Sequence, residues 1–183
     1  MRIVELAAGE KIPERLDGVE AVVCLGGPMN VYEEASFPFL KQEDALIRDI
    51  VRKQIPFLGI CLGAQLLSKA CGGKVYKAPA KELGWSNVTL TPEGAMDPLF
   101  QGTGQPFTVF QWHEDTFSIP EGGTLLATSA RCRNQAFRVG SCAYGLQFHV
   151  EVTPDMVAAW TAAHMQAHGR ELDGAKLLFE TIS

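Results

Sequence analysis

The chain has 183 residues, which is enough for one domain with a substantial core. Its 46% hydrophobic and 20% charged residues are typical of a globular protein and argue against a disordered or fibrous one. A formal net charge of −5 leaves no cationic surface on the scale that binding several phosphates requires, so no nucleic acid partner is expected. No apolar run approaches the roughly 18–20 residues that cross a bilayer, and no signal peptide opens the chain, so we expect a cytoplasmic protein without a membrane partner.

The first half of the chain reads as alternating strands and helices. Residues 2–7 and 21–25 predict strands, and the second of these ends in the Gly26-Gly27-Pro28 loop. Helical spacing of apolar residues follows over 38–53, then an apolar strand at 57–60 and a helix over 64–70. This order predicts a β–α–β unit and hence a parallel sheet with right-handed crossovers.

The second half is richer in strands. Residues 74–76, 85–90, 107–112, 124–128 and 135–149 predict strands separated by turns that contain glycine and proline. A helix then begins at Pro154, with Thr153 as its N-cap. No repeat or linker interrupts the chain, so residues 1–183 are expected to form a single domain.

A cysteine between two glycines marks the first candidate site. In the segment Gly59-Ile60-Cys61-Leu62-Gly63, Cys61 stands where an apolar strand turns into a helix, an arrangement typical of a nucleophile elbow. The helix that follows directs free N–H groups and its positive dipole end toward the sulfur, which favours the thiolate. A buried cysteine after a strand can also serve packing alone, so this motif by itself leaves both interpretations open.

A histidine and a glutamate lie two positions apart near the end of the predicted strand region. On a strand, this spacing places the side chains of His149 and Glu151 on the same face. A carboxylate beside an imidazole fixes its tautomer and stabilises its charged form, so His149 could act as general base and acid for a nearby nucleophile. Cys61 and His149 are far apart in sequence, and only the fold can bring them together.

Three segments in this order resemble the class I (triad-type) glutamine amidotransferases. In chain order they are the Leu25-Gly26-Gly27-Pro28 loop, the Gly59–Leu67 elbow and the Gln147–Thr153 segment. Among these enzymes the chain is most similar to stand-alone members that resemble the amidotransferase domain of GMP synthase. The resemblance implies a three-layer α/β/α, flavodoxin-like fold with a mostly parallel central sheet, and glutamine as substrate.

The resemblance also implies a role for each matching residue. Cys61 would attack the glutamine amide, His149 would carry the proton to the departing ammonia, and Glu151 would orient His149, with a glutamyl thioester as intermediate. Backbone N–H groups of Gly27 and Leu62 would form the oxyanion hole. Gly26 would allow the substrate to approach the backbone closely.

The glutamine pocket would be completed from two further segments. Gln65, one helical turn after Cys61, matches the position that contacts the amino-acid end of the substrate. Glu114 and Asp115 match a segment that lines the pocket through backbone groups. His113 lies in what reads as a polar loop, without the strand-borne carboxylate two positions on that accompanies His149, so His149 is the stronger candidate for the base.

Two features depart from the family pattern. Relatives usually begin with one more strand and helix before the segment that matches residues 2–7, so the resemblance implies a sheet without that first strand and helix. Either the first strand takes another position, a partner or a second copy of the chain fills the gap, or the chain is a shortened version without compensation. Val150 stands where many relatives have proline, and valine leaves the His149 and Glu151 pair intact.

No metal site or cofactor is expected. The five cysteines are odd in number and lack a C-x-x-C pair, which favours reduced thiols. His164 and His168 have the i, i+4 spacing of zinc ligands on a helix but lack a third ligand.

Three functions are compatible with these residues. The first is hydrolysis of glutamine to release ammonia; since no phosphate-binding glycine loop is found, any synthetic role implies a partner protein, such as a synthetase subunit, or a second substrate. The second is hydrolysis of a γ-glutamyl conjugate. The third is a weakly active regulatory or binding module that keeps the fold.

Overall fold

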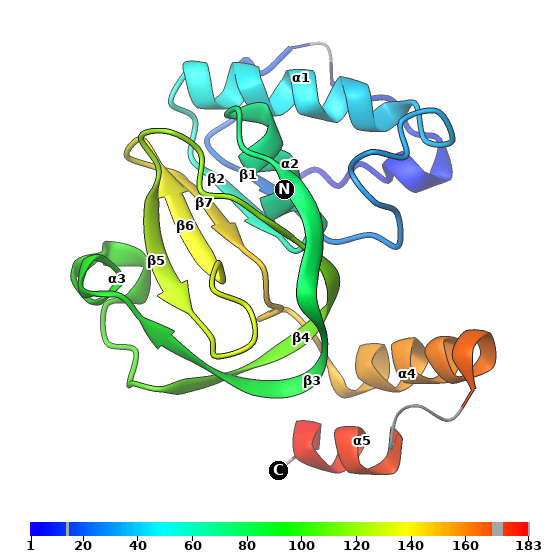
Figure 1. The fold of residues 1–183 in the computed structure, drawn as a ribbon. Coiled ribbons are helices and arrows are strands. Elements are labelled where there is room, and N and C mark those ends of the chain that lie inside the picture. The colour runs from blue at the N-terminus through cyan, green and yellow to red at the C-terminus, as the bar shows by residue number, and fades with distance from the viewer. Residues whose placement is uncertain (14, 170–173, 183) are drawn as a thin grey trace.

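A computed structural model describes residues 1–13, 15–169 and 174–182 (Figure 1). Within them a seven-stranded sheet forms the centre, in the order β1-β2-β7-β6-β5-β3-β4. These strands are β1 (Val22–Cys24), β2 (Phe57–Ile60), β3 (Val75–Leu90), β4 (Phe107–Phe117), β5 (Thr124–Thr128), β6 (Ala136–Val139) and β7 (Ala143–Leu146).

The sheet is mixed. β1 pairs with β2 in parallel, and β2 pairs with β7 in parallel. The pairs β7–β6, β6–β5, β5–β3 and β3–β4 are antiparallel. The predicted β–α–β unit is confirmed, because α1 (Phe39–Arg52) joins β1 to β2 and α2 (Leu62–Ala70) follows β2 directly.

Helices α1 and α2 lie together on one side of the sheet (Figure 1). α1 is amphipathic, and its apolar side buries Leu40, Ile47 and Ile50 against α2 and the sheet. α2 is buried along most of its length, from Leu62 to Ser68. A helix enclosed in this way holds its first residue in a fixed position, which matters because that end carries Cys61.

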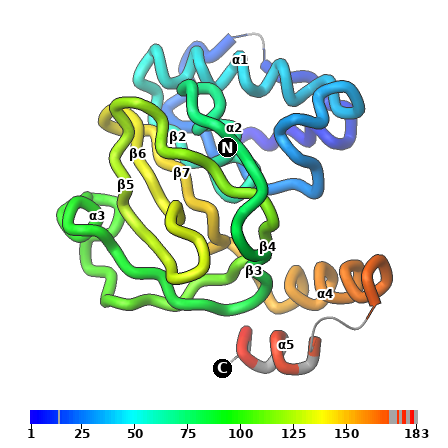
Figure 2. The backbone as a smooth tube through the Cα atoms, in the orientation of Figure 1, coloured from blue at the N-terminus to red at the C-terminus, as the bar shows by residue number. Residues whose placement is uncertain are grey.

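The remaining helices lie elsewhere on the sheet. The short α3 (Pro92–Met96) packs near β5, followed by the 3₁₀ turn η2 (Pro98–Phe100). α4 (Pro154–His168) and α5 (Gly174–Ile182) contact each other at the end of the molecule away from α1 (Figure 2). The predicted cap is confirmed, since Thr153 Oγ1 accepts the Met156 N–H at 3.3 Å. None of the helices that the structure describes is long and apolar enough to span a bilayer.

Four expectations about strands are wrong. Residues 2–7 form no strand, because the chain there leads into the 3₁₀ turn η1 (Leu6–Ala8). Ile3 is 70% exposed, so this segment does not bury its apolar side chains against the sheet as a paired strand would. The predicted strands 74–76 and 85–90 are one strand, β3, which continues through an irregularity between Lys77 and Glu82. β4 extends to Phe117 because it pairs with β3 along its length, so His113 is a strand residue and does not lie in a loop.

The fourth correction concerns residues 135–149. A turn around Gly140, which has a φ of +59°, divides this region into the antiparallel pair β6 and β7. β7 ends at Leu146, so His149 and Glu151 come after the strand. Their proximity must therefore be established from contacts and cannot rest on strand periodicity.

Gly63 illustrates how tightly α2 packs on β1. A Cβ at this position would collide with the backbone carbonyl of Cys24, which cannot move without disturbing the sheet. We expect Gly63→Ala to lower the free energy of unfolding by about 1–3 kcal/mol, as overpacked cores do, measured by urea denaturation. Gly104→Ala is the control: no atom lies within 4 Å of its added Cβ, so a change of under about 0.5 kcal/mol is expected. Equal losses in the two variants would contradict the packing argument.

Candidate active site

Cys61 lies at the turn between β2 and α2. Its backbone adopts φ 52° and ψ −104°, in a region that non-glycine residues rarely occupy, and its N–H donates to the Leu146 carbonyl at 2.7 Å. The parallel pairing of β2 with β7 thus holds the strained turn in place. This is the geometry of a nucleophile elbow, as the sequence predicted.

The Cys61 sulfur is almost completely buried. Burial raises the pKa of the thiol to about 12, the Leu62 N–H opposes this rise, and the charges of Glu151 and Asp115 add to it. Sγ also contacts two polar groups: it lies 3.8 Å from the Trp112 carbonyl oxygen and 3.7 Å from the Gln147 amide nitrogen. A thiol in these surroundings stays protonated until a base removes its proton.

His149 is held through its backbone by β4. Its N–H donates to the Phe110 carbonyl at 2.8 Å and its carbonyl accepts the Phe110 N–H at 3.4 Å, which forms an isolated antiparallel bridge. The imidazole Nδ1 lies 2.7 Å from Glu151 Oε1, and Glu151 Oε2 accepts the Val150 N–H at 2.9 Å. Although burial acts in the opposite direction, the hydrogen bond and charge of His149 hold the Glu151 pKa below its usual value.

The remaining imidazole nitrogen is available. His149 Nε2 is buried and has no hydrogen-bond partner among the described residues. Because Glu151 is ionised and faces Nδ1, that nitrogen carries the proton and Nε2 presents its lone pair. This is the protonation state that a general base requires.

Gly26 shows that Cys61 and His149 are neighbours. An added Cβ at Gly26 would lie 3.3 Å from His149 Cε1 and 3.5 Å from Cys61 Cβ, so both side chains border the same point. Cε1 is the ring atom between the two nitrogens, and Glu151 occupies the Nδ1 side. The structure therefore brings together the three residues that the sequence singled out.

An aromatic cluster packs against the imidazole. The Trp160 ring, from α4, meets the His149 ring edge-on with centroids 5.1 Å apart. Trp160 also packs against Phe110 and Trp112 of β4. Sequence analysis missed this role of Trp160, because an aromatic residue on a helix gives no sign of which residue it contacts.

Gly27 and Leu62 adjoin each other beside the elbow. A Cβ on Gly27 would lie 2.6 Å from Met29 Sδ and 3.2 Å from Leu62 Cδ2. The Leu62 backbone N–H acts on the Cys61 sulfur and lowers the thiol pKa. Gly27 therefore lies beside the residue that follows the nucleophile.

Of the predicted pocket residues, Gln65 and Asp115 are buried, whereas the Glu114 side chain is exposed. Gln65 is buried, and its Nε2 donates to the Asp115 carbonyl at 3.3 Å. The Asp115 carboxylate is also buried, with Lys77 Nζ 2.9 Å from Oδ1, and its Oδ2 has no hydrogen-bond partner among the described residues. The Glu114 side chain is exposed and lies 2.8 Å from Lys81 Nζ, so it faces away from this buried group.

His113 belongs to a separate buried network. Its Nδ1 lies 3.0 Å from the Asp115 carbonyl and its Nε2 lies 3.1 Å from Glu82 Oε2, which also accepts from Gln135 Nε2 at 2.8 Å. Glu82, His113 and Cys132 place possible metal-ligand atoms within 4.8 Å of one another. These atoms already pair with neighbouring protein groups, so the set reads as a structural support for β4.

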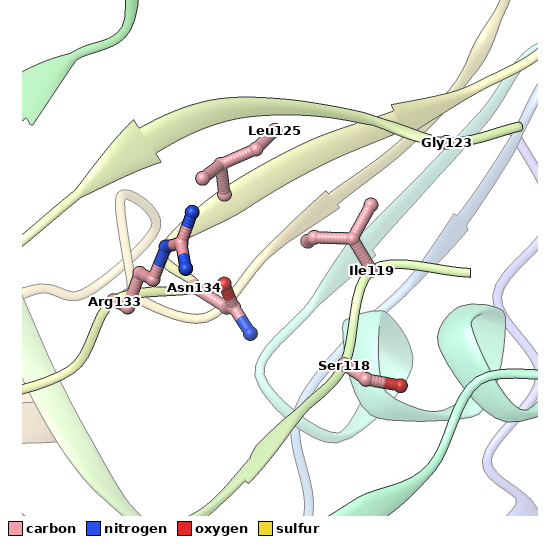
Figure 3. Close-up of a pocket in the computed structure, with 6 residues that line it drawn as sticks. All are labelled: Ser118, Ile119, Gly123, Leu125, Arg133 and Asn134. Atoms are coloured by element: carbon pink, nitrogen blue, oxygen red, sulfur yellow. The ribbon is translucent and has the colours of Figure 1, made fainter. Parts of the chain in front are cut away.

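Figure 3 shows a pocket on the surface of the protein. Its lining is Ser118, Ile119, Gly123, Leu125, Arg133 and Asn134. Ser118 accepts a hydrogen bond from Ser68, which lies seven residues after Cys61 and hence about 10 Å further along α2 at 1.5 Å per residue. With Arg133 as its only charged side chain and no cysteine or histidine, this pocket offers no acyl-transfer chemistry.

Comparison with known proteins gives consistent matches. The chain is 37% identical over 153 residues to the glutamine amidotransferase-like protein YfeJ of Salmonella typhimurium, covering 82% of this chain and 64% of that protein. It is 38% identical over 145 residues to a glutamine-hydrolyzing GMP synthase of Porphyromonas gingivalis, covering 78% of this chain and 27% of the synthase. The chain thus spans less than two thirds of the length of these curated relatives.

Solved structures agree with the sequence matches. A glutamine amidotransferase from Thermotoga maritima superposes with a TM-score of 0.88 at 39% identity, covering 97% of this chain and 76% of that one. A glutamine amidotransferase from Methylobacillus flagellatus gives a TM-score of 0.87 at 30% identity, covering 98% and 75%. These likenesses confirm the flavodoxin-like fold class that the sequence motifs implied. Residues 3–158 match the family described as glutamine amidotransferase class-I, and the chain belongs to that family.

Proposed function

We propose that this protein hydrolyses the side-chain amide of glutamine through Cys61, His149 and Glu151. One observation carries the proposal: a buried imidazole, paired with a carboxylate through Nδ1 at 2.7 Å, keeps Nε2 unpaired among the described residues beside the elbow cysteine. An unpaired buried nitrogen costs folding free energy, so stability alone does not account for it. A role as the general base that shuttles protons to and from Cys61 does account for it.

The first half of the reaction forms a thioester. His149 Nε2 takes the thiol proton while Sγ attacks the amide carbon, and the carbonyl electrons move to oxygen. The N–H groups of Gly27 and Leu62 would receive this oxyanion, and each such donor contributes roughly 3–4 kcal/mol of barrier reduction. As the carbon–nitrogen bond breaks, Nε2 returns its proton to the leaving nitrogen, which departs as ammonia.

The second half releases glutamate. Water loses a proton to His149 Nε2 and attacks the thioester carbon, the carbon–sulfur bond breaks, and the sulfur regains the proton. Glu151 stays ionised throughout and stabilises the imidazolium that forms in each half. The raised pKa of Cys61 fits this scheme, because the proton leaves the thiol only as the attack occurs.

Ammonia released in this way needs an acceptor. The relative from Porphyromonas gingivalis is a glutamine-hydrolyzing GMP synthase, and this chain spans 27% of its length. A further solved structure, described as part of a GMP synthase from Thermoplasma acidophilum, superposes with a TM-score of 0.64 at 34% identity. We propose that a synthetase subunit or domain supplies the acceptor, in the cytoplasm.

The direct test is to incubate the purified protein with glutamine and follow glutamate and ammonia in equal amounts. Acid quenching during turnover should trap a γ-glutamyl adduct on the tryptic peptide that carries Cys61, visible by mass spectrometry. Release of both products without any adduct on that peptide would overturn the mechanism. A folded protein that releases neither product would overturn the proposed activity for this chain acting alone.

Asp115 is proposed to hold the α-ammonium group of glutamine. Its carboxylate is buried, near enough to Cys61 to affect the thiol pKa, and one oxygen lacks a hydrogen-bond partner among the described residues. We expect Asp115→Asn to raise KM about 10- to 100-fold with a smaller effect on kcat, as loss of a charge-assisted hydrogen bond would.

Asp97→Asn is the matched control for this variant. Asp97 is equally buried beside a basic partner, with Arg138 Nε 2.8 Å from its Oδ2, but it lies outside the site. This control should lose stability and keep its KM. A normal KM in folded Asp115→Asn would remove Asp115 from the binding site.

A further inference from the structure

A chain of buried amides connects the pocket wall to the sulfur. Gln65 Nε2 lies 3.3 Å from the Asp115 carbonyl oxygen and 3.4 Å from Gln147 Oε1. Gln147 Nε2 in turn lies 3.7 Å from Cys61 Sγ. Both glutamines are buried, at 4% and 0% exposure, so no water competes for these bonds.

The direction of this chain follows from its first member. A backbone carbonyl can only accept, so the Gln65 atom that faces the Asp115 carbonyl must be its NH₂ group. The same NH₂ group faces Gln147, which must therefore present its oxygen there. The Gln147 NH₂ group is left on the side of the sulfur, because the reverse orientation would oppose two donors.

The Gln147 backbone is fixed as well. Its N–H donates to the Gln135 carbonyl at 2.8 Å, and His149, two residues later, is bonded to Phe110. The amide thus reaches Cys61 from the same segment that carries the base. Its position does not depend on a mobile side chain at the protein surface.

We infer that Gln147 donates a hydrogen bond that stabilises the Cys61 thiolate and fixes the sulfur for attack. The inference rests on the proposed function and names one more residue of that site. The charged groups around the sulfur disfavour a thiolate there, and a hydrogen-bond donor to the sulfur opposes this effect. Glu151 and Asp115 are both negative and disfavour a second negative charge at Sγ, while His149 is the group that takes the proton.

Two neutral donors face the sulfur among the described residues. They are the N–H group of Leu62 and the amide of Gln147. In the proposed mechanism the Leu62 N–H turns to the substrate oxyanion. The Gln147 amide can stay on the sulfur through both halves of the reaction, including the step in which the thiolate leaves the thioester.

The test is the rate at which iodoacetamide alkylates Cys61, since alkylation requires the thiolate and no glutamine. Gln147→Met keeps the side-chain length and removes the donor. We expect its alkylation rate at fixed pH, followed on the peptide that carries Cys61, to fall about tenfold, as a rise of about one pKa unit requires. The thiol pKa rises and the thiolate fraction below it shrinks, so the deficit should persist at every pH below both titration midpoints.

Two further variants make the result decisive. Gln147→Glu keeps the side-chain shape and the acceptor that Gln65 needs, but it replaces the donor with a negative charge. The alkylation rate of Cys61 in this variant should therefore fall further. This variant also tests the role of the Gln147 donor if Gln147→Met does not fold. Gln111→Met removes another fully buried amide, bonded to Gln135 at 2.9 Å and not to the sulfur, and should alkylate like the wild type. Unchanged alkylation in the folded Gln147 variants, or an equal fall in Gln111→Met, would overturn the inference. Either outcome is independent of whether the protein hydrolyses glutamine.

Discussion

Replacement of Cys61 by alanine should reduce glutamine hydrolysis by at least about 10⁴-fold. The expected loss is this large because the variant cannot form the thioester, although it keeps the pocket. Cys61, His149 and Glu151 act together in catalysis, so removal of the nucleophile also makes the other two ineffective. Initial rates of ammonia release at saturating glutamine measure the effect. Alanine keeps the Cβ and hence the same backbone strain at the φ of 52°, and it removes only one buried sulfur atom, so the variant should remain folded.

Cys142→Ala provides the control for Cys61→Ala. Its sulfur contacts the Gln54 carbonyl near the start of β7 and lies outside the site. This variant should hydrolyse glutamine at the wild-type rate. Substantial activity in Cys61→Ala, with Cys142→Ala also active, would mean that another group attacks the amide.

Replacement of His149 by alanine should lower kcat by about 10³- to 10⁴-fold. Without the imidazole, the Cys61 thiol loses the one base that the proposed mechanism assigns to it, and burial together with the Glu151 and Asp115 charges keeps the thiol protonated. Glu151→Gln should cost less, about 10- to 100-fold, because the imidazole keeps its place in the bridge to Phe110 while it loses the charge that stabilises its protonated form.

The double variant provides a sharper measurement. Glu151 acts through His149, so the loss in His149→Ala/Glu151→Gln should match the loss in His149→Ala alone. Additive losses would assign Glu151 a role of its own. His168→Ala, an exposed histidine late in α4, should leave the rate unchanged and controls for general effects of histidine removal.

Local patterns predicted the elements that form the parallel part of the sheet. Apolar runs gave β1 and β2, helical spacing gave α1, and the glycines around Cys61 gave the turn into α2. The Thr153 cap was also correct, since a cap depends on residues only three positions away. These features are decided by neighbours in the sequence.

Features decided by distant residues could not be predicted in this way. The sequence around residues 2–7 does not reveal that no strand pairs with them. The sequence around His113 does not reveal that pairing with β3 continues β4 beyond this residue. The contacts of Gln147 with Cys61 and of Trp160 with His149 join residues on different elements. Gln147 did stand in the segment that carried the family resemblance, but only its contacts indicate a role.

The pairing of β2 with β7 has a consequence for how the site comes into being. It joins residues 57–60 to residues 143–146, so the elbow cysteine reaches its base only when these two distant segments have paired. The His149 and Glu151 pair needs no such long-range contact, because the two residues are neighbours in sequence. A nascent chain that has not yet produced β7 would therefore hold the nucleophile without its base, and reactive chemistry would arise only in molecules in which β2 and β7 are paired.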